Sequence, residues 1–325
     1  SLSPNYPQLY EDLGSVFAMQ SRFDEAIPEL EKAIQLQPAL PLAHKKLGQA
    51  LAAVGRGKEA DEEFQTYINS DPNREDVIKA ADLLNKERTE EAINALRAIL
   101  KSKPDDVNAM RYLALAYRKD DKNLQDAEAL LRSAVQQAPD FIPAWFDLGS
   151  LLSVRDKKME AIAAYQKVVK LDPENAAAWG GLGSAYAVAM YPDKSAEAYA
   201  KSVALKPDVP NVLMGQAHVL KTLGDQAGAL KSYRAAIKIK PDFGEVYWSM
   251  ANLKIFQFEE EEVSAMLQQL EQDSLSKSEE IHFRFALGKA FEDKKDYEQA
   301  WHYYHTGNQE QRAIVDHYPV EMEMR

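Results

Sequence analysis

Large apolar residues, small residues and prolines recur along the chain in one repeating pattern. The clearest copy places these residues at Trp179, Leu182, Gly183, Tyr186, Tyr199 and Pro207. Prolines in matching contexts occur 34, 32, 35, 34, 34 and 34 residues apart, at Pro38, Pro72, Pro104, Pro139, Pro173, Pro207 and Pro241. Self-similarity at a fixed period of this length predicts an array of stacked structural repeats.

The pattern resembles that of the tetratricopeptide repeat family along the whole chain. The resemblance implies an all-α fold, an α-solenoid in which about nine helical hairpins form a right-handed superhelix. Small residues fit this fold because glycine on the first helix and alanine on the second let two helices pack closely. The glycines at the eighth position of a repeat are Gly14, Gly48, Gly149, Gly183 and Gly288.

The register of the pattern divides the chain into nine units. Their predicted bounds are 7–40, 41–74, 75–106, 107–141, 142–175, 176–209, 210–243, 244–280 and 281–318. The third unit is two residues short, and the fourth has one extra residue near Asp120, Asp121 and Lys122. No linker rich in Pro, Gly or Ser interrupts the units, so we expect residues 1–325 to form a single solenoid domain.

Helix ends can be predicted from particular residues. Gly55 and Gly224 fall where a first helix must end and turn, a role that suits a residue free to take positive φ. Prolines are expected to open first helices, where no backbone donor is lost, at Pro41, Pro143 and Pro210. The polar stretch at 273–280 is expected to cap the first helix of the ninth unit, whose second helix should run on to about residue 316.

Two segments near the C-terminus, 244–256 and 285–312, resemble the end of the repeat region in bacterial tetratricopeptide sulfotransferases. In that family a catalytic domain follows the repeats, with a phosphosulfate-binding loop that has no counterpart in these 325 residues. The resemblance therefore implies that the chain is a non-catalytic recognition region. The family's catalytic residues match no position here, so we assign no catalytic residue.

Composition narrows the possible partners and compartments. The chain has 39 basic and 51 acidic residues, a net charge of −12, and no cluster of basic residues that would follow a phosphate backbone, so nucleic acid is not an expected partner. There is no cysteine, no apolar run long enough for a membrane span and no visible secretory signal at the start. We expect a cytoplasmic location and no membrane partner.

Other motifs that suggest chemistry have simpler interpretations. The glycines of 180–184 and of 55–58 invite a phosphate site, but the first set falls inside a predicted helix and the second at a helix end. His302 and His305 have the spacing of a metal pair on a helix, without any supporting HExxH motif. We therefore predict no cofactor and no metal.

The main functional feature is a surface along the first helices. The resemblance implies that positions 2, 5, 9 and 12 of these helices line a concave groove. Position 5 changes from charged to apolar toward the C-terminus, reading Glu11, Lys45, Arg111, Phe146, Gly180, Met214, Trp248 and Phe285. Exposed apolar side chains here would anchor a peptide or dock a following domain, with polar contacts from Asn211, His218, Lys221, Ser249 and Asn252. The alternative is that the aromatic residues only pack between neighbouring first helices.

The sequence thus predicts a protein-interaction scaffold that binds a peptide or partner protein in its groove. The candidate groove residues are Phe146, Met214, His218, Lys221, Trp248, Asn252 and Phe285. The preferred role is the recognition region of a bacterial tetratricopeptide sulfotransferase, and the alternative is a freestanding adaptor in complex assembly, secretion or chaperoning. A third hypothesis is that the chain itself completes an active site. Both a monomer and a homodimer are compatible with the apolar groove.

Overall fold

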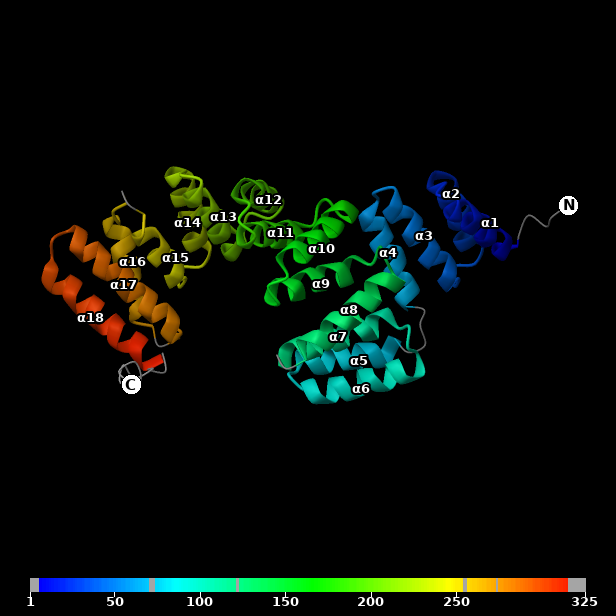
Figure 1. Cartoon of the computed structure of the whole chain (residues 1–325), viewed down its shortest axis with the longest axis horizontal. Coiled ribbons are helices and arrows are strands. Elements are labelled where there is room, and N and C mark those ends of the chain that lie inside the picture. The colour runs from blue at the N-terminus through cyan, green and yellow to red at the C-terminus, as the bar shows by residue number, and fades with distance from the viewer. Residues whose placement is uncertain (1–5, 70–73, 121–122, 254–255, 273, 315–325) are drawn as a thin grey trace, which may run out of the picture. The chain divides into compact units, whose positions relative to one another are not determined.

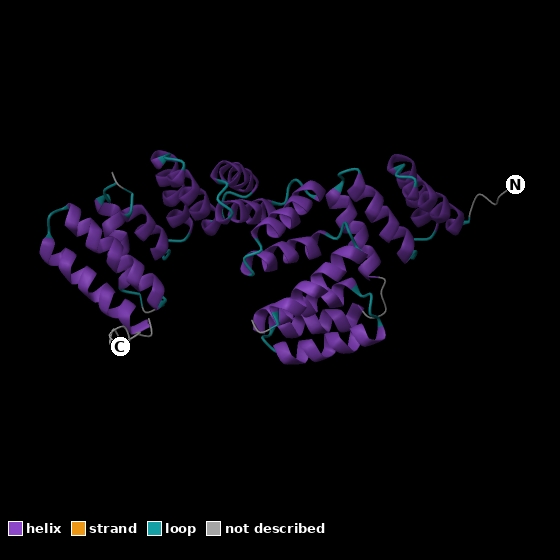
Figure 2. Ribbon diagram, viewed as in Figure 1, coloured by secondary structure: helices purple, strands orange, loops and turns teal. Residues whose placement is uncertain are grey.

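The computed structural model describes residues 6–69, 74–120, 123–253, 256–272 and 274–314. These residues form eighteen helices and no strand, which confirms the predicted all-α fold class of helical hairpins (Figures 1 and 2). Contacts group the chain into two compact units, 1–190 and 191–325. The fourth unit is predicted to have one extra residue near positions 120–122. Of these positions, 121 and 122 lie outside the described residues.

The first unit contains eleven of the described helices. Their bounds are α1 Pro7–Met19, α2 Phe23–Leu36, α3 Pro41–Ala53, α4 Gly57–Asn69, α5 Arg74–Asn85, α6 Thr89–Ser102, α7 Val107–Asp120, α8 Leu124–Gln137, α9 Ile142–Val154, α10 Lys158–Leu171 and α11 Ala176–Val188. The second unit contains the other seven. They are α12 Pro192–Leu205, α13 Pro210–Thr222, α14 Gln226–Ile239, α15 Gly244–Ala251, α16 Glu260–Leu270, α17 Lys277–Asp293 and α18 Tyr297–Ile314.

Several glycines on first helices lie against large side chains of the second helix, which agrees with the predicted close packing of the two helices. A Cβ added at Gly149 would lie 3.0 Å from the ring of Tyr165, and one at Gly288 would lie 2.6 Å from the ring of Tyr304. These distances are shorter than ordinary van der Waals contact, so the two helices of a hairpin can approach this closely only because glycine has no side chain.

The turns of seven hairpins share one backbone conformation in the described chain. All the residues with positive φ lie two residues after one helix ends and two before the next begins, and they are Ser21, Gly55, Glu87, Asp156, Met190, Gly224 and Lys295. Gly55 and Gly224, with φ of 84° and 87°, confirm the predicted turn glycines. At the first of these turns the amide of Arg22 donates to the carbonyl of Phe17, the pairing typical of a Schellman motif.

Helix starts also follow the prediction. Pro41 and Pro210 are the first residues of α3 and α13, and Pro143 is the second residue of α9. The Ser276 hydroxyl accepts a hydrogen bond from the amide of Glu279 at the start of α17, which confirms the predicted cap. The long helix α18 continues to Ile314, and the end predicted for it lies outside the described residues.

The large residue near the start of a first helix links that helix to the loop before it. The indole N–H of Trp145 donates to the carbonyl of Pro139 at 2.7 Å, and that of Trp179 to the carbonyl of Pro173 at 2.9 Å. At the equivalent position, a ring nitrogen of His44 lies 2.9 Å from the carbonyl of Pro38. In these three repeats the aromatic residue and the preceding proline of the pattern are therefore hydrogen-bonded partners.

The core of the first unit joins hairpins that are not consecutive. One apolar cluster combines buried residues of α2, α3 and α4, such as Leu30 and Phe64, with Ile142, Val168 and Leu171 of α9 and α10. Gly57 at the start of α4 lies against the carbonyl of Leu171, so closely that no side chain would fit.

The core of the second unit is a cluster contributed by its helices from α13 to α17. Tyr233, Met250, Met266, Phe283 and Leu287 are among its fully buried side chains. The helix α15 has only eight residues, whereas α13 and α17 have thirteen and seventeen. The segment after it packs Leu253 and Phe258 into the same core.

Candidate functional site

Six of the seven candidate groove residues lie on the second unit. Met214, His218 and Lys221 are on α13, Trp248 is on α15 with Asn252 just after it, and Phe285 is on α17. The seventh, Phe146, is on α9 of the first unit. The C-terminal part of the predicted set thus lies within one compact unit, and we treat Phe146 separately.

The three apolar residues Met214, Trp248 and Phe285 occupy the same position on successive first helices, and we call them the apolar row. The rings of Trp248 and Phe285 are 5.3 Å apart between centroids with an interplanar angle of 42°. All three side chains are half-buried, and Met214 and Trp248 also pack against the core of the unit. The row thus combines partial core packing with an apolar surface that remains accessible.

His218 lies on the same face of α13 as Met214, one turn further along the helix. Its Nε2 atom is 3.2 Å from the hydroxyl of Ser249, next to Trp248. Burial lowers the pKa of His218, the charge of Glu245 raises it, and the charge of Lys221 lowers it further. The net effect is a lower pKa, which favours a neutral imidazole at neutral pH.

Beneath His218 lies Tyr233, which the sequence analysis assigned to no site. The His218 and Tyr233 rings meet edge to face at 5.6 Å, and the Tyr233 side chain is fully buried. Burial raises the pKa of Tyr233 to about 12, while the nearby Ser249 hydroxyl lowers it. Within the described residues the phenol oxygen has no hydrogen-bond partner of good geometry. An aromatic residue on a second helix is ordinarily a core residue, so the sequence contained no signal for this contact.

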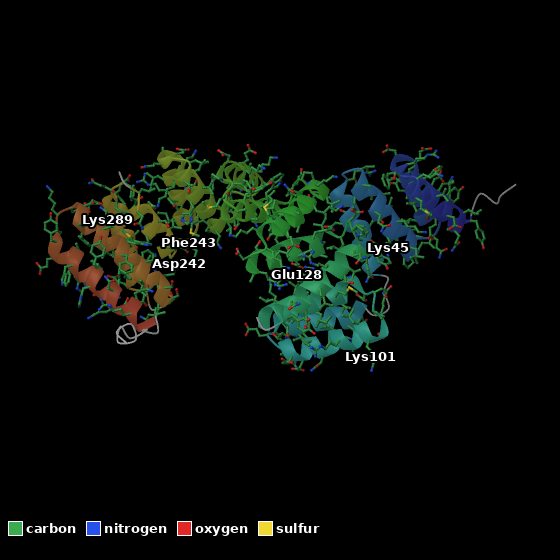
Figure 3. The ribbon with its side chains drawn as sticks, viewed as in Figure 1. Lys45, Lys101, Glu128, Asp242, Phe243 and Lys289 are labelled. Carbon is green, nitrogen blue, oxygen red and sulfur yellow. The ribbon has the colours of Figure 1, made fainter. Side chains whose placement is uncertain are left out.

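Two of the predicted polar contacts behave differently from each other. Asn252 is exposed, and its side-chain amide donates to the backbone carbonyl of Trp248 at 2.8 Å, which leaves the amide oxygen for a ligand. Lys221 is half-buried and forms no ion pair with any described residue. On α17, the Lys289 ammonium, labelled in Figure 3, pairs with Asp293 in the same helix.

Phe146 is part of an interface within the first unit. Its ring meets that of Tyr165 edge to face at 5.8 Å, and it packs against the cluster that joins α2–α4 with α9–α11. The neighbouring Asp147 pairs with Arg111, with Nε and Oδ2 2.5 Å apart. Tyr165 lies on α10, the second helix of the same hairpin, so the half-buried Phe146 packs mainly within its own hairpin. A contact between neighbouring first helices, which the alternative predicts, occurs instead between Trp248 and Phe285.

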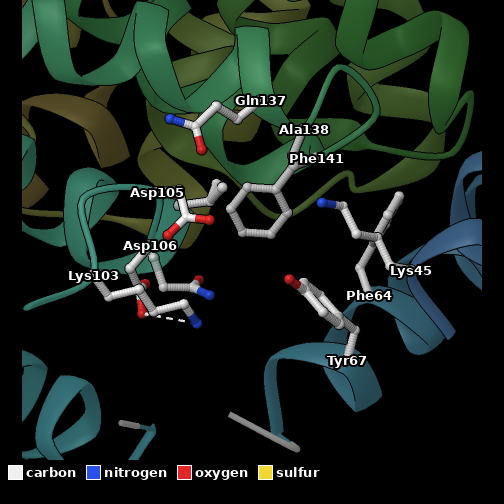
Figure 4. Close-up of a pocket in the computed structure, with 11 residues that line it drawn as sticks. Lys45, Phe64, Tyr67, Lys103, Asp105, Asp106, Gln137, Ala138 and Phe141 are labelled. Atoms are coloured by element: carbon white, nitrogen blue, oxygen red, sulfur yellow. Dashed lines mark ion pairs between the residues drawn. The ribbon is translucent and has the colours of Figure 1, made fainter. Parts of the chain in front are cut away.

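The first unit also contains a small cavity of about 60 Å³ (Figure 4). Phe64 and Tyr67 of α4, Asp105 and Asp106 before α7, and Phe141 before α9 help to line it. Burial raises the pKa of Tyr67, and the charges of Asp105 and Asp106 raise it further. A volume of this size is sufficient for ordered water.

The motifs that suggested other chemistry are found in structural roles. Gly181 lies within α11, and a Cβ there would come within 2.6 Å of the Tyr165 ring. His305 stacks on Trp301 at 5.4 Å, whereas His302 meets Tyr303 edge to face at 5.2 Å. In the part of the chain that the structure describes, no group of three or more His, Asp or Glu residues is placed to hold a metal ion.

Paired helices with a glycine–aromatic contact and a left-handed turn residue define a helical-hairpin repeat protein. Three family models, each described as Tetratricopeptide repeat, match this chain: one matches residues 79–140 and 146–210, another residues 17–86, and the third residues 210–243. Together they cover more than half of the chain, which belongs to the tetratricopeptide repeat family.

Similar proteins match only part of the chain. Human Protein O-mannosyl-transferase TMTC1 is 26% identical over 165 residues, which are 49% of this chain and 19% of that protein. Human Tetratricopeptide repeat protein 13 is 29% identical over 120 residues, 36% of this chain and 14% of that protein. The chain therefore spans less than a fifth of the length of these relatives.

Solved structures of MamA are also similar to about half of the chain. One crystal structure of MamA is 27% identical and covers 49% of this chain and 93% of its own, with a TM-score of 0.46. MamA 41-end from Desulfovibrio magneticus RS-1 is 20% identical and covers 50% of this chain and 91% of its own, with a TM-score of 0.47. No helix in the described part of the chain combines the length and apolar character that a bilayer span requires.

Proposed function

We propose that this tetratricopeptide protein is an interaction scaffold that binds an extended peptide, or a loop of a partner protein, across the apolar row. The observation that supports this most is the ring contact between Trp248 and Phe285, two half-buried aromatic residues from different helices. Two rings in contact at this tilted angle form a rigid apolar platform, which suits the anchor residue of a ligand.

The polar residues beside the platform define the rest of the proposed contact. Lys221 offers a cation without an ion pair in the described chain, and the amide oxygen of Asn252 accepts a hydrogen bond from a peptide amide. The neutral His218 adds no charge next to the platform. We therefore expect the ligand to place an apolar residue on the row, with an acidic group toward Lys221.

The test uses peptides selected from a random display library against the whole chain. Trp248→Ala should weaken binding of the selected peptides roughly 30-fold, the equivalent of about 2 kcal/mol, because it removes the anchor. Phe285→Ala should weaken the same peptides, and Phe146→Ala is the matched control that should not. Circular dichroism should show each variant folded.

Other results would contradict the proposal. If Trp248→Ala unfolds the second unit as well as losing the peptide, Trp248 acts as a core residue. If Phe146→Ala weakens binding as much as Trp248→Ala, the apolar row is not the binding surface.

For the biological setting, we propose that this surface belongs to the recognition region of a bacterial tetratricopeptide sulfotransferase. The support is the resemblance of segments 244–256 and 285–312 to the end of that family's repeats. The intact mass of the natural gene product tests this. A longer product that transfers sulfate would support it, and a product that ends near residue 325 would favour the freestanding adaptor.

A further inference from the structure

The cavity of the first unit is lined by a residue that departs from the repeat pattern. Seven positions after the small residue of a second helix, several hairpins have a fully buried alanine, as at Ala33, Ala134 and Ala236. The same position of α4 is Tyr67, which is half-buried, and Figure 4 shows its hydroxyl directed into the cavity. The tyrosine therefore forms a polar aromatic wall where other hairpins have close packing.

Three hairpins that are not all consecutive form this cavity. Phe64 and Tyr67 belong to α4, the segment 103–108 leads into α7, and Phe141 lies just before α9. Phe64 and Phe141 are only 4% and 2% exposed, so their rings form a fixed apolar wall. A compound bound in the cavity would contact the second, fourth and fifth hairpins at the same time.

Four charged residues line the cavity, and two of them pair with each other. The Lys103 ammonium lies 3.8 Å from the carboxylate of Asp106, which also caps the start of α7. Within the described residues, the other two, Lys45 and Asp105, form no ion pair. The Lys45 ammonium lies instead 5.5 Å from the centre of the Tyr67 ring. The cavity thus has one cation and one anion that no described residue of opposite charge neutralises.

These two charged side chains reach the cavity from different hairpins. In Figure 4 the Lys45 ammonium and the Asp105 carboxylate lie on either side of the Phe141 ring. The charge of Asp105 raises the pKa of Tyr67, so this carboxylate acts on the interior of the cavity. A single compound pairs with both side chains only if it carries two opposite charges. Asp105 is exposed, so the compound can enter from solvent on that side.

We propose that this cavity binds a small amino acid in its zwitterionic form, with the carboxylate of the ligand on Lys45 and its ammonium on Asp105. Both contacts are charge-assisted hydrogen bonds, and Phe64 and Phe141 contact the carbon atoms of the ligand. The cavity is small, about 60 Å³, so the proposal concerns the smallest amino acids, glycine and alanine. This site is independent of the apolar row and of the proposed peptide ligand.

Isothermal titration calorimetry of the whole 325-residue chain with L-alanine tests the proposal. L-Alanine should bind to the wild type. Ethylamine and propionate each keep only one of the two charges of L-alanine. Both should bind at least about tenfold more weakly, because each loses one charge-assisted hydrogen bond.

Substitutions at the two charged residues test the assigned contacts. Lys45→Gln should lower the affinity for L-alanine to that of ethylamine, and Asp105→Asn should lower it to that of propionate. Tyr67→Ala gives α4 the residue that α2, α8 and α14 have at this position, so it should fold, and it should weaken L-alanine by removing one wall. The matched control is Lys101→Gln, since Lys101, labelled in Figure 3, is exposed on α6 outside the cavity. This variant should bind L-alanine like the wild type.

Three results would overturn the proposal. The first is no binding of L-alanine to the wild type up to about 10 mM, beyond the range of weak specific binding. The second is binding of ethylamine or propionate as tight as that of L-alanine, since a single charge would then be sufficient. The third is an equal effect of Lys101→Gln and Lys45→Gln, which would attribute the binding to surface charge in general. Circular dichroism should show each variant folded, and the comparison of the three ligands on the wild type does not depend on any variant.

Discussion

Replacement of Glu128 by Gln tests how the hairpins of the first unit are joined. Glu128, labelled in Figure 3, lies on α8 with a side chain that is only 6% exposed. Its carboxylate is 2.8 Å from Arg132 and 2.8 Å from Lys157, and it also pairs with Arg155. Arg155 follows α9 and Lys157 precedes α10, so one carboxylate links α8 to the turn of the next hairpin.

The expected magnitude follows from burial and charge. Removal of one partner from a buried ion pair costs about 3–5 kcal/mol, and the partly exposed cations here favour the lower end, about 3 kcal/mol. For a unit of this size each kcal/mol lowers the melting temperature by about 2–4 °C, so Glu128→Gln should lower it by roughly 6–12 °C. Thermal unfolding followed by circular dichroism measures the change.

The pH dependence makes this prediction more specific. Burial alone would raise the pKa of Glu128, but hydrogen bonds from Lys157 and Arg132 and the charge of Arg155 bring it below its ordinary value. A carboxyl with a lowered folded pKa stabilises the protein above its unfolded pKa, near 4.5, and this stability is lost as the pH falls through the folded pKa. The wild type and Glu128→Gln should therefore differ at neutral pH and converge at lower pH.

Glu174→Gln is the matched control. Glu174 also pairs with a lysine, Lys58, but both side chains are more than 60% exposed, so no measurable loss of stability is expected. The reasoning would be refuted if the two variants lost equal stability, or if the effect of Glu128→Gln were the same at neutral and acidic pH.

Two further predictions concern single sites. Gly288→Ala should destabilise the second unit by about 1–3 kcal/mol, since a Cβ would lie 2.6 Å from the Tyr304 ring. Denaturant unfolding measures this change. A gain in stability, which is usual for Gly→Ala in a helix, would show that α17 and α18 pack less closely than this distance implies. Burial lowers the pKa of His218, so its contribution to stability is present above the unfolded pKa of 6.5 and lost as the pH falls through the folded pKa. The free energy of unfolding of the wild type and of His218→Gln, measured across this pH range, checks the prediction. Identical pH profiles would show that His218 does not cause the pH dependence of stability.

The hairpin repeat itself could be predicted from the sequence because its contacts are local. Gly149 and Tyr165 are sixteen residues apart in one hairpin, and their meeting requires only two helices and a short turn. The turn conformation at Gly55 and the cap at Ser276 depend on even fewer neighbouring residues. Such features are properties of the residue types at fixed spacing, and the structure confirms them.

The candidate surface could be predicted only in outline. The sequence indicated which positions share a face of the first helices, including those of Trp248 and Phe285, but it predicted exposed side chains where the structure has half-buried ones. How deeply such a side chain sits depends on the distance and angle between consecutive hairpins, which no spacing in the sequence specifies.

Contacts between distant parts of the chain depend on the tertiary structure alone. The cluster that joins Leu30 to Val168, and the ion pair of Lys58 with Glu174, connect residues more than a hundred positions apart. A repeat pattern predicts that each hairpin meets its neighbours, and it is silent about hairpins further away. The sequence by itself therefore accounts for the repeat, its turns and its helix ends, because these follow from nearby residues. The packing between non-consecutive hairpins depends on the sum of many small angles between consecutive hairpins along the chain.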